Sequence, residues 1–503
     1  MDLGNLTLQP DCSSGPEPQY TEFVPGFHIE HFGCRAARAD GEAVGSHLRA
    51  AGLTELQPSA ADVVVVNTCS VTAEADRAAR AFIRRAHRLN PEARIVVAGC
   101  YAQRAPRELA ALPGVAAVVG NSHKALAPEI ALRLVQSPVN ASPVPDPALV
   151  SVQSLLAASV RPAVAPIWAD DRFAHSFLEE TQLVPGAQTR PNLKIQEGCG
   201  NRCTFCVIPQ TRGSSRSLPG ASVLRQVEGF VAAGGKELVL SGINLGRWGR
   251  DLPLSEAIPG DLSAPRTLAG LVRAIFGRTA LPRLRLSSIE PMDWDAEMIG
   301  LMAEFGGTRL ARHVHLPLQS GSDGVLRRMH RRYRPWHYVE KVDALRRAAG
   351  PELTVGADVM VGFPGETDAE FDQTVALIRA LPFGYLHLFP FSPRPDTPAW
   401  ALHAERPVPA PVVEERMGFL RALAAEKSKA HRSCFVEREL EVLTLHTPPA
   451  LESQGRTSAL SENFLPVELD ARLPANQLVR ARVTGLSAEG ALRAAVKTVA
   501  GGF

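Results

Sequence analysis

The sequence predicts an α/β protein with three folded parts: an N-terminal open parallel α/β domain, a central partial (β/α)6 barrel and a small C-terminal β-barrel. Short apolar runs alternate with helical patterns in two regions, and a segment rich in proline and alanine separates them. The last ~70 residues carry closely spaced strand-like runs instead. A length of 503 residues agrees with several domains, because it exceeds what one hydrophobic core supports.

The N-terminal domain is expected over residues 24–136, after a polar, proline-containing segment, 1–23, that is expected to be disordered. Its strand candidates are Phe27–Phe32, Val63–Val66, Ile95–Ala98 and Val115–Val119. From Ala75 to Leu89, apolar side chains recur every 3.6 residues with arginines on the other face, which is typical of an amphipathic helix. This alternation predicts a parallel sheet with both faces covered.

Residues 137–190 are rich in proline, alanine and serine, with prolines recurring from Pro138 to Pro166. This composition predicts a linker or a loose insertion. Within it, the apolar pairs Leu155–Leu156 and Ile167–Trp168 are the kind of element that docks on another part of the chain.

The central barrel is expected over residues 191–432. Helical segments separate six strand candidates: Leu193–Gln196, Glu237–Leu240, Arg283–Ser287, His313–Leu316, Thr354–Val361 and Tyr385–Phe389. Pro219 and Pro335 suit first helical turns. Six such units in about 200 residues predict a partial barrel, whose chemistry belongs at the carboxyl ends of its strands.

The C-terminal part, residues 433–503, follows a helix expected around Val412–His431. Its strand-like runs are Leu440–Leu445, Phe464–Leu469, Leu478–Thr484 and Leu492–Val496. Short strands at this spacing predict a small β-barrel.

Composition narrows the classes of protein that remain. Hydrophobic residues make up 45% and charged residues 21% of the chain, as in ordinary globular proteins. The net charge of +2 does not indicate a nucleic-acid partner, so such a contact needs a local patch. Because the N-terminal segment is polar and has no apolar run, we expect no secretory signal peptide, and no stretch approaches the ~18 apolar residues of a membrane span. We expect a cytoplasmic protein, in which eight cysteines act as metal ligands or catalytic thiols more often than as disulfides.

Cys199, Cys203 and Cys206 form a C-x3-C-x2-C pattern directly after the first predicted barrel strand. Three thiolates on one loop ligate three irons of a [4Fe–4S] cluster and leave the fourth iron open for a small chelating ligand. A structural zinc site needs four ligands, and a fourth is missing here. The pattern favours a redox-active cluster over a zinc knuckle or three unrelated cysteines.

Cys34, Cys69 and Cys100 are far apart in the sequence, yet each comes just after a predicted strand of the N-terminal domain. Carboxyl ends of parallel strands meet at one crevice, the usual ligand site of such sheets. Taken singly, each cysteine would more often be a small buried core residue. Their equivalent topological positions favour a second three-cysteine cluster site. Cys12 and Cys434 lack such company and receive no role.

The sequence resembles radical S-adenosylmethionine (SAM) methylthiotransferases from about Phe27 to Val499. An aromatic residue before the last cysteine of the first trio, here Phe205, is usual in the radical SAM superfamily. The matching segments are Val66–Thr72, Ala98–Gln103, Lys194–Gly213, Leu240–Gly246, Arg285–Pro291, His315–Ser322 and Asp358–Thr367.

The resemblance implies an auxiliary [4Fe–4S] cluster on Cys34, Cys69 and Cys100, a SAM-binding [4Fe–4S] cluster on the other trio, and a C-terminal TRAM β-barrel. It also implies that one SAM methylates a sulfur held at the auxiliary cluster. A second SAM would be reduced to methionine and a 5′-deoxyadenosyl radical, which removes a hydrogen from an unactivated carbon before the methylthio group is inserted. Partners implied are a flavodoxin or ferredoxin as electron donor and a sulfur donor, with the enzyme a monomer.

Among subfamilies, the segments Asn67–Ala75 and Arg212–Ser217 look most like the MtaB type, which acts on N6-threonylcarbamoyladenosine at position 37 of tRNA. The alternatives are the MiaB type, which acts on isopentenyladenosine in tRNA, and the RimO type, which acts on a ribosomal-protein aspartate. One departure concerns Cys34: the family usually has asparagine three residues later, where this chain has Ala37. A hydrogen bond that supports the cluster loop is therefore in question.

Further SAM or substrate contacts are expected at the barrel mouth. The candidates are Glu237, Ser288, Glu290, Gln319 and Ser320. Glu237 follows Gly234 and Gly235, where related barrels have a Gly-Gly-Glu element that meets the SAM amino group; the alternative is a helix end followed by a strand start.

RNA contacts are expected in the densest basic run of the chain and in the TRAM-like region. The candidates are Arg327, Arg328, Arg331, Arg332, Arg334 and Arg456. The alternative for the basic run is a solvated helix end. A non-catalytic RNA-binding protein with structural zinc sites is the competing hypothesis of a different class.

Overall fold

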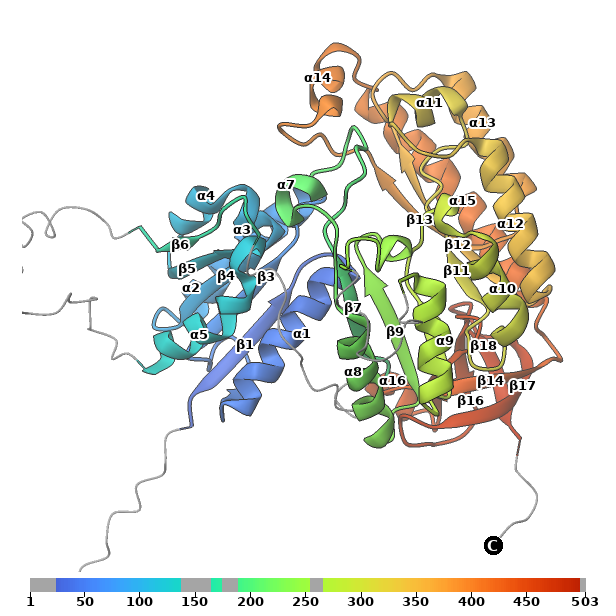
Figure 1. Ribbon diagram of the computed structural model, residues 1–503, viewed down its shortest axis with the longest axis horizontal. Coiled ribbons are helices and arrows are strands. Elements are labelled where there is room, and N and C mark those ends of the chain that lie inside the picture. The colour runs from blue at the N-terminus through green and yellow to red at the C-terminus, as the bar shows by residue number, and fades with distance from the viewer. Residues whose placement is uncertain (1–23, 137–163, 174–188, 254–265, 498–503) are drawn as a thin grey trace, which may run out of the picture.

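The computed structural model describes residues 24–136, 164–173, 189–253 and 266–497 (Figure 1). The disorder expected of residues 1–23, and most of the linker expected over 137–190, lie outside the described residues. No helix in the described ranges is long and apolar enough to cross a bilayer.

A six-stranded parallel sheet forms the N-terminal domain. Its strands, in spatial order, are β2 (Thr54–Glu55), β1 (Gly26–His31), β3 (Val63–Thr68), β4 (Arg94–Gly99), β5 (Val115–Gly120) and β6 (Ile167–Trp168). The four predicted strands are all present. Ile167–Trp168 docks beside β5 as the edge strand.

Helices cover both faces of this sheet, as Figure 1 shows. One face packs on α1 (Arg35–Ala50) and α5 (Ala127–Gln136), the other on α2 (Ala73–Leu89), α3 (Cys100–Arg104) and α4 (Pro106–Ala110). A 3-10 turn, η1 (Asn121–Leu126), follows β5. The side chain of Thr72 accepts a hydrogen bond from the Ala75 amide and so starts α2.

Six parallel strands form the incomplete barrel. They are β7 (Asn192–Glu197), β9 (Glu237–Gly242) and β10 (Arg283–Leu286), followed by β11 (His313–His315), β12 (Thr354–Val361) and β13 (Phe383–Pro390). Backbone hydrogen bonds from Leu284 to Arg309 and from Ala311 to Leu284 join the two halves. A short antiparallel strand, β8 (Arg216–Ser217), lies beside β7.

Helices follow the barrel strands and cover their outer face around one large apolar core. They are α8 (Gly220–Ala232), α9 (Leu268–Arg278), α10 (Ala296–Phe305), α11 (Asp323–Arg328), α12 (Pro335–Ala349), α13 (Asp368–Ala380), α14 (Pro398–Glu405) and α15 (Ala410–Ser433). The short α7 (Ile208–Arg212), directly after the Cys199–Cys206 loop, lies between the N-terminal domain and the barrel (Figure 1).

A closed five-stranded barrel forms the C-terminal domain. Its strands are β14 (Glu439–Thr444), β15 (Thr457–Ser461), β16 (Pro466–Leu469), β18 (Leu492–Val496) and β17 (Leu478–Leu486), with α16 (Pro449–Glu452) in a loop. Its loop side chains cover the amino ends of the large barrel's strands: Phe464 packs on His313, with ring centroids 4.3 Å apart, and Glu462 pairs with Arg312. The predicted fold class is confirmed.

Candidate iron–sulfur centres and their surroundings

Strand register brings the first cysteine trio together. His31 lies opposite Asn67, and Asn67 opposite Ala98, so β1, β3 and β4 end level with one another. Cys34, Cys69 and Cys100 therefore lie just past the carboxyl ends of three neighbouring strands, as the sequence predicts. A Cβ at Gly33 would lie 2.6 Å from the Cys69 Sγ, so the Cys34 loop packs directly on Cys69.

The pKa of Cys69 rises to about 12, chiefly because the thiol is buried, and the neighbouring Cys100 and Cys34 raise it further. Iron binds the thiolate, so loading this trio must release protons.

The first turn of α1, directly after Cys34, is held by a hydrogen bond despite the unusual Ala37. The Asn67 side chain, from the next strand, donates a hydrogen bond to the Ala37 carbonyl oxygen. Thr68 Oγ1 donates to the Ala98 carbonyl oxygen at 2.6 Å and holds the Cys69 and Cys100 loops together. Asn67 thus supplies a hydrogen bond to the segment after Cys34, where the loss of the usual asparagine had put such support in question.

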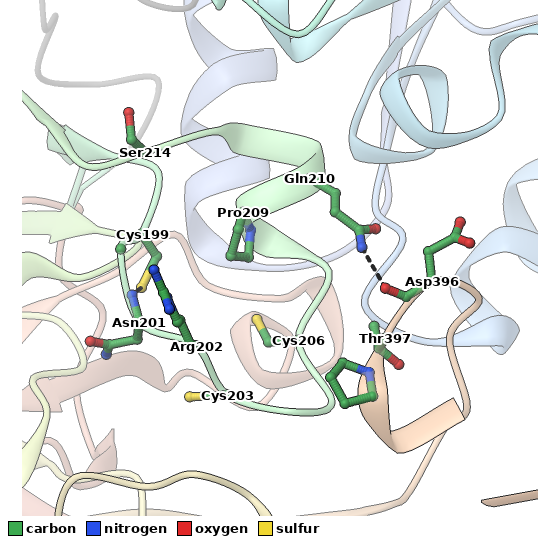
Figure 2. Close-up of a pocket in the computed structure, with 12 residues that line it drawn as sticks. Cys199, Asn201, Arg202, Cys203, Cys206, Pro209, Gln210, Ser214, Asp396 and Thr397 are labelled. Atoms are coloured by element: carbon green, nitrogen blue, oxygen red, sulfur yellow. Dashed lines mark hydrogen bonds between the residues drawn. The ribbon is translucent and has the colours of Figure 1, made fainter. Parts of the chain in front are cut away.

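The second cysteine trio lines a pocket of about 370 Å³ at the carboxyl end of β7 (Figure 2). Figure 2 shows Cys199, Cys203 and Cys206 along one loop, with α7 on one side and the segment 396–398 on another. The lining residues besides the cysteines are Gly200, Asn201, Arg202, Pro209, Gln210, Ser214, Asp396, Thr397 and Pro398. Burial raises the pKa of Cys206 to about 12 and also raises that of Cys199.

Two side chains donate hydrogen bonds to sulfurs of this trio. Arg331 Nη1 lies 3.4 Å from Cys203 Sγ, and Asn244 Nδ2 lies 3.5 Å from Cys199 Sγ. Arg331 also donates to Glu290 Oε1 at 2.6 Å. N–H donors and positive charge stabilise thiolates, so this surrounding fits an anionic iron–sulfur cluster.

Unpartnered polar atoms mark the space above the barrel strands. Asn244 Oδ1, Ser287 Oγ and Gln319 Oε1 are buried without a hydrogen-bond partner among the described residues. The three residues follow β9, β10 and β11 respectively, at the carboxyl ends where barrel ligands bind. Buried polar atoms normally find partners, so these fit a polar ligand such as SAM beside the cysteine loop.

Comparison with known proteins finds family matches over both cysteine regions. The pattern of the radical SAM superfamily matches residues 193–378, which contain Cys199, Cys203 and Cys206. Uncharacterized protein family UPF0004 matches residues 26–120, which contain the other trio. A threonylcarbamoyladenosine tRNA methylthiotransferase MtaB of Bacillus subtilis is 35% identical over 88% of this chain and 89% of its own length. The chain belongs to the radical SAM methylthiotransferase family.

Other relatives carry a second name. A tRNA-2-methylthio-N(6)-dimethylallyladenosine synthase of Geobacter metallireducens is 35% identical over 75% of this chain and 77% of its own. Among solved structures, the radical SAM methyltransferase TsrM of Kitasatospora setae is similar with a TM-score of 0.48 and 16% identity over 76% of each chain. Family membership makes the chain a radical SAM enzyme that uses SAM and a [4Fe–4S] cluster.

The predicted SAM contacts lie partly where the sequence placed them. Gln319 and Ser320 follow β11, although the Ser320 hydroxyl already contacts Thr374 Oγ1 at 3.1 Å. Ser288 and Glu290 follow β10, and Glu290 binds Arg331. Asn244 and Ser287 were missed as site residues, although Ser287 ends one predicted strand and Asn244 follows another.

Glu237 is a correction. It stands at the amino end of β9, with 0% of its surface exposed, where Arg285 Nε donates to its carboxylate at 2.8 Å and Arg283 lies 3.3 Å away. Arg283 and Arg285 in turn contact Glu441 and Ser461 of the C-terminal domain. Glu237 therefore lies at the barrel end opposite the cysteines, and the prediction that it meets SAM is wrong.

Acidic partners accompany the predicted RNA contacts. Arg327 and Arg334 pair with Asp323, Arg328 with Glu370, and Arg332 with Asp293; Arg456 pairs with Glu468 and Asp470. Arg331 is only 7% exposed and is directed at Cys203, so its prediction as a phosphate contact is corrected. The basic run is not a continuous cationic surface.

Four further polar residues, none of them predicted as a site residue, lie on neighbouring barrel strands: His315 of β11, Asp358 of β12, and Tyr385 and His387 of β13. Asp358 lies 3.0 Å from His315 Nε2 and 3.4 Å from His387 Nδ1. Tyr385 OH contacts His315 Nδ1 at 3.0 Å. His315, Asp358 and His387 are residue types that can hold a metal ion, but in this structure their side chains contact one another.

Proposed function

We propose that this chain transfers a methylthio group to C2 of N6-threonylcarbamoyladenosine at position 37 of tRNA. The observation that carries the proposal is the set of relatives named threonylcarbamoyladenosine tRNA methylthiotransferase, 31–35% identical over 82–91% of this chain. The segments Asn67–Ala75 and Arg212–Ser217 support the same subfamily.

The second part of the proposal is an auxiliary [4Fe–4S] cluster on Cys34, Cys69 and Cys100. Its support is the convergence of three thiols at one sheet edge, with Arg212 and Asn121 donating to Cys100 Sγ, each at 3.3 Å. A cluster with three protein ligands has an open iron on which an external sulfur can be carried.

The protein's own residues place the reactants. Bound clusters and SAM supply the radical and sulfur chemistry. Asn244, Ser287 and Gln319 would orient SAM at the open iron of the Cys199–Cys206 cluster. Helix α7 directly follows the Cys199–Cys206 loop, and Arg212 at its end donates to Cys100, so a nucleoside bound beside α7 would lie near both centres.

A local positive patch at the barrel mouth supports tRNA as the partner. The buried Asp293 carboxylate is shared by Arg247 at 3.3 Å, Arg332 at 3.2 Å and Arg250 at 3.7 Å. One carboxylate balances only one of three guanidinium groups, and all three are partly exposed. We propose that these arginines, with Arg327 and Arg334 of the basic run, bind tRNA phosphates, and that Arg456 of the C-terminal domain is a separate contact.

Replacing Arg250 and Arg332 by alanine should weaken tRNA binding at every sequence tested and lower the salt dependence by about one counterion per side chain. Fluorescence anisotropy over a range of salt concentrations measures both. Arg88→Ala is the control, because Arg88 is exposed at the end of α2, at the edge of the sheet away from the cysteines. If the dependence of tRNA affinity on salt concentration is unchanged in the double variant, these arginines do not contact tRNA phosphates.

The second candidate substrate is the isopentenylated adenosine. Relatives named tRNA-2-methylthio-N(6)-dimethylallyladenosine synthase are 32–35% identical, a range that overlaps the first group. Electron donation by a flavodoxin or ferredoxin, a separate sulfur donor and a monomeric enzyme are further parts of the proposal.

Nucleoside analysis distinguishes the substrates. The chain is expressed in a bacterial strain lacking its own methylthiotransferases, and digested tRNA is examined by mass spectrometry. We expect the methylthio form of threonylcarbamoyladenosine to appear, with isopentenyladenosine unmodified. The reverse pattern would establish the second candidate, and a methylthio mass on a ribosomal peptide alone would refute a tRNA substrate.

A further inference from the structure

Five buried charged side chains meet at the junction of the N-terminal domain and the barrel. Asp40 and Lys124 come from the N-terminal domain, whereas Lys194, Glu197 and Arg212 come from the barrel. Arg212 Nη1 lies 2.7 Å from Glu197 and 3.1 Å from Asp40. Each lysine also contacts both carboxylates. This buried charge cluster ties the two domains together beside α7.

The charges of the cluster do not cancel. Three cations face two carboxylates: burial lowers the pKa of Lys124, whereas the neighbouring Asp40 and Glu197 favour its charged form. The two lysines alone would balance Asp40 and Glu197. The surplus positive charge is therefore that of Arg212, whose side chain is 0% exposed. A buried unbalanced charge is costly unless an anion lies beside it.

The other contacts of the Arg212 side chain indicate where such an anion lies. Arg212 Nε donates to Cys100 Sγ at 3.3 Å, and Nη2 is buried without a partner among the described residues. Asn121 Nδ2 donates to the same sulfur at 3.3 Å and to the Thr211 carbonyl oxygen at 2.9 Å. Both side chains thus face the proposed auxiliary centre.

The SAM centre repeats this pair of residue types. Arg331 donates to Cys203 Sγ and Asn244 donates to Cys199 Sγ, and Arg331 is anchored by Glu290. Each cysteine trio therefore has one buried arginine and one asparagine among its sulfur donors. The arginines belong to different elements, and the sulfur that each one contacts belongs to a different trio.

We propose that Arg212 and Asn121 are positioning residues of the auxiliary cluster, which donate N–H groups to Cys100 and stabilise the more negative, reduced state of that cluster. The inference rests on the auxiliary cluster of the proposed function. Because Arg212 ends α7, the same contact fixes the SAM-cluster loop against the auxiliary centre. N–H donors and positive charge at cluster sulfurs raise the reduction potential, so their removal lowers it.

The test uses the full-length chain with one cluster at a time. In a Cys203→Ala background only the auxiliary cluster remains, and its potential is measured by a redox titration followed by electron paramagnetic resonance. Arg212→Met should shift the reduction equilibrium about tenfold toward the oxidised cluster, equal to about 59 mV more negative. Asp40, Glu197, Lys124 and Lys194 remain balanced in this variant, so the junction keeps its ion pairs.

Arg331→Met is the matched control in the same background and should leave the auxiliary potential unchanged. In a Cys69→Ala background the two variants exchange roles. Arg331→Met should lower the reduction potential of the SAM cluster, and Arg212→Met should leave it unchanged. Asn121→Ala removes one donor without altering the charge cluster, and should lower the auxiliary potential even if Arg212→Met fails to retain iron.

Three outcomes overturn the inference. Auxiliary potentials that stay unchanged in both Arg212→Met and Asn121→Ala would show that neither donor acts on the cluster. Equal shifts by Arg331→Met would show a general effect of lost charge. If the Cys203→Ala chain itself holds no cluster, the auxiliary centre of the proposed function fails, and the inference fails with it.

Discussion

Replacing Cys203 by alanine is expected to abolish reductive SAM cleavage, with formation of 5′-deoxyadenosine falling at least about 1,000-fold, a barrier increase of roughly 4 kcal/mol. The cysteine lines the pocket at the carboxyl end of β7, and its sulfur receives the Arg331 hydrogen bond. With two thiolates left, the loop cannot hold three irons and present the fourth to SAM. Anaerobic assay with dithionite and chromatographic detection of 5′-deoxyadenosine measures the loss.

Cys434→Ala is the matched control for this variant. Cys434 is exposed at the end of α15, and its thiol contacts only the Ala430 carbonyl oxygen among the hydrogen bonds of the described chain. It should cleave SAM at the rate of the unaltered enzyme. Retention of cleavage in Cys203→Ala would mean that this loop does not carry the SAM cluster.

Replacing Cys69 by alanine is expected to separate SAM cleavage from methylthio transfer. Cys69 is buried between the Cys34 and Cys100 loops and lies far along the chain from the SAM trio. The variant should still form 5′-deoxyadenosine, because the barrel centre is intact, while methylthio product falls at least about 1,000-fold. Both products are measured in one reaction with unmodified substrate tRNA.

The same reaction provides the control. In Cys203→Ala, SAM cleavage and methylthio transfer should both fall. In Cys69→Ala, only methylthio transfer should fall. Full methylthio transfer by Cys69→Ala would show that the N-terminal trio carries no sulfur, and would leave the chain with a single functional centre.

The sequence predicts most of the fold because the signals are local. Val63–Val66 and Ile95–Ala98 are apolar runs of strand length, and the 3.6-residue stripe of α2 requires a helix against them. Equivalent positions after three such strands were enough to bring Cys34, Cys69 and Cys100 together. The strand Thr457–Ser461 escaped prediction, since its small and polar residues carry little strand signal.

Side-chain partners far apart in sequence could not be predicted. Glu237 begins the predicted strand Glu237–Leu240, which already places it at the amino end of the barrel, but its partners Arg283 and Arg285 lie on the next strand. Arg331 reads as one member of a basic run, but its burial against Cys203 follows from the tertiary fold. Arg212 contacts Cys100 across 112 positions of sequence, and no periodicity records such a contact.

Iron determination on the anaerobically reconstituted chain is the most direct test of the central claim. The claim is that one enzyme holds two [4Fe–4S] clusters, each with one iron that no cysteine binds. The unaltered protein should hold about eight irons, and Cys203→Ala and Cys69→Ala about four each, since every [4Fe–4S] cluster contributes four. Mössbauer spectra should assign the iron to cubane clusters. About four irons in the unaltered chain, or zinc in place of iron, would contradict the claim.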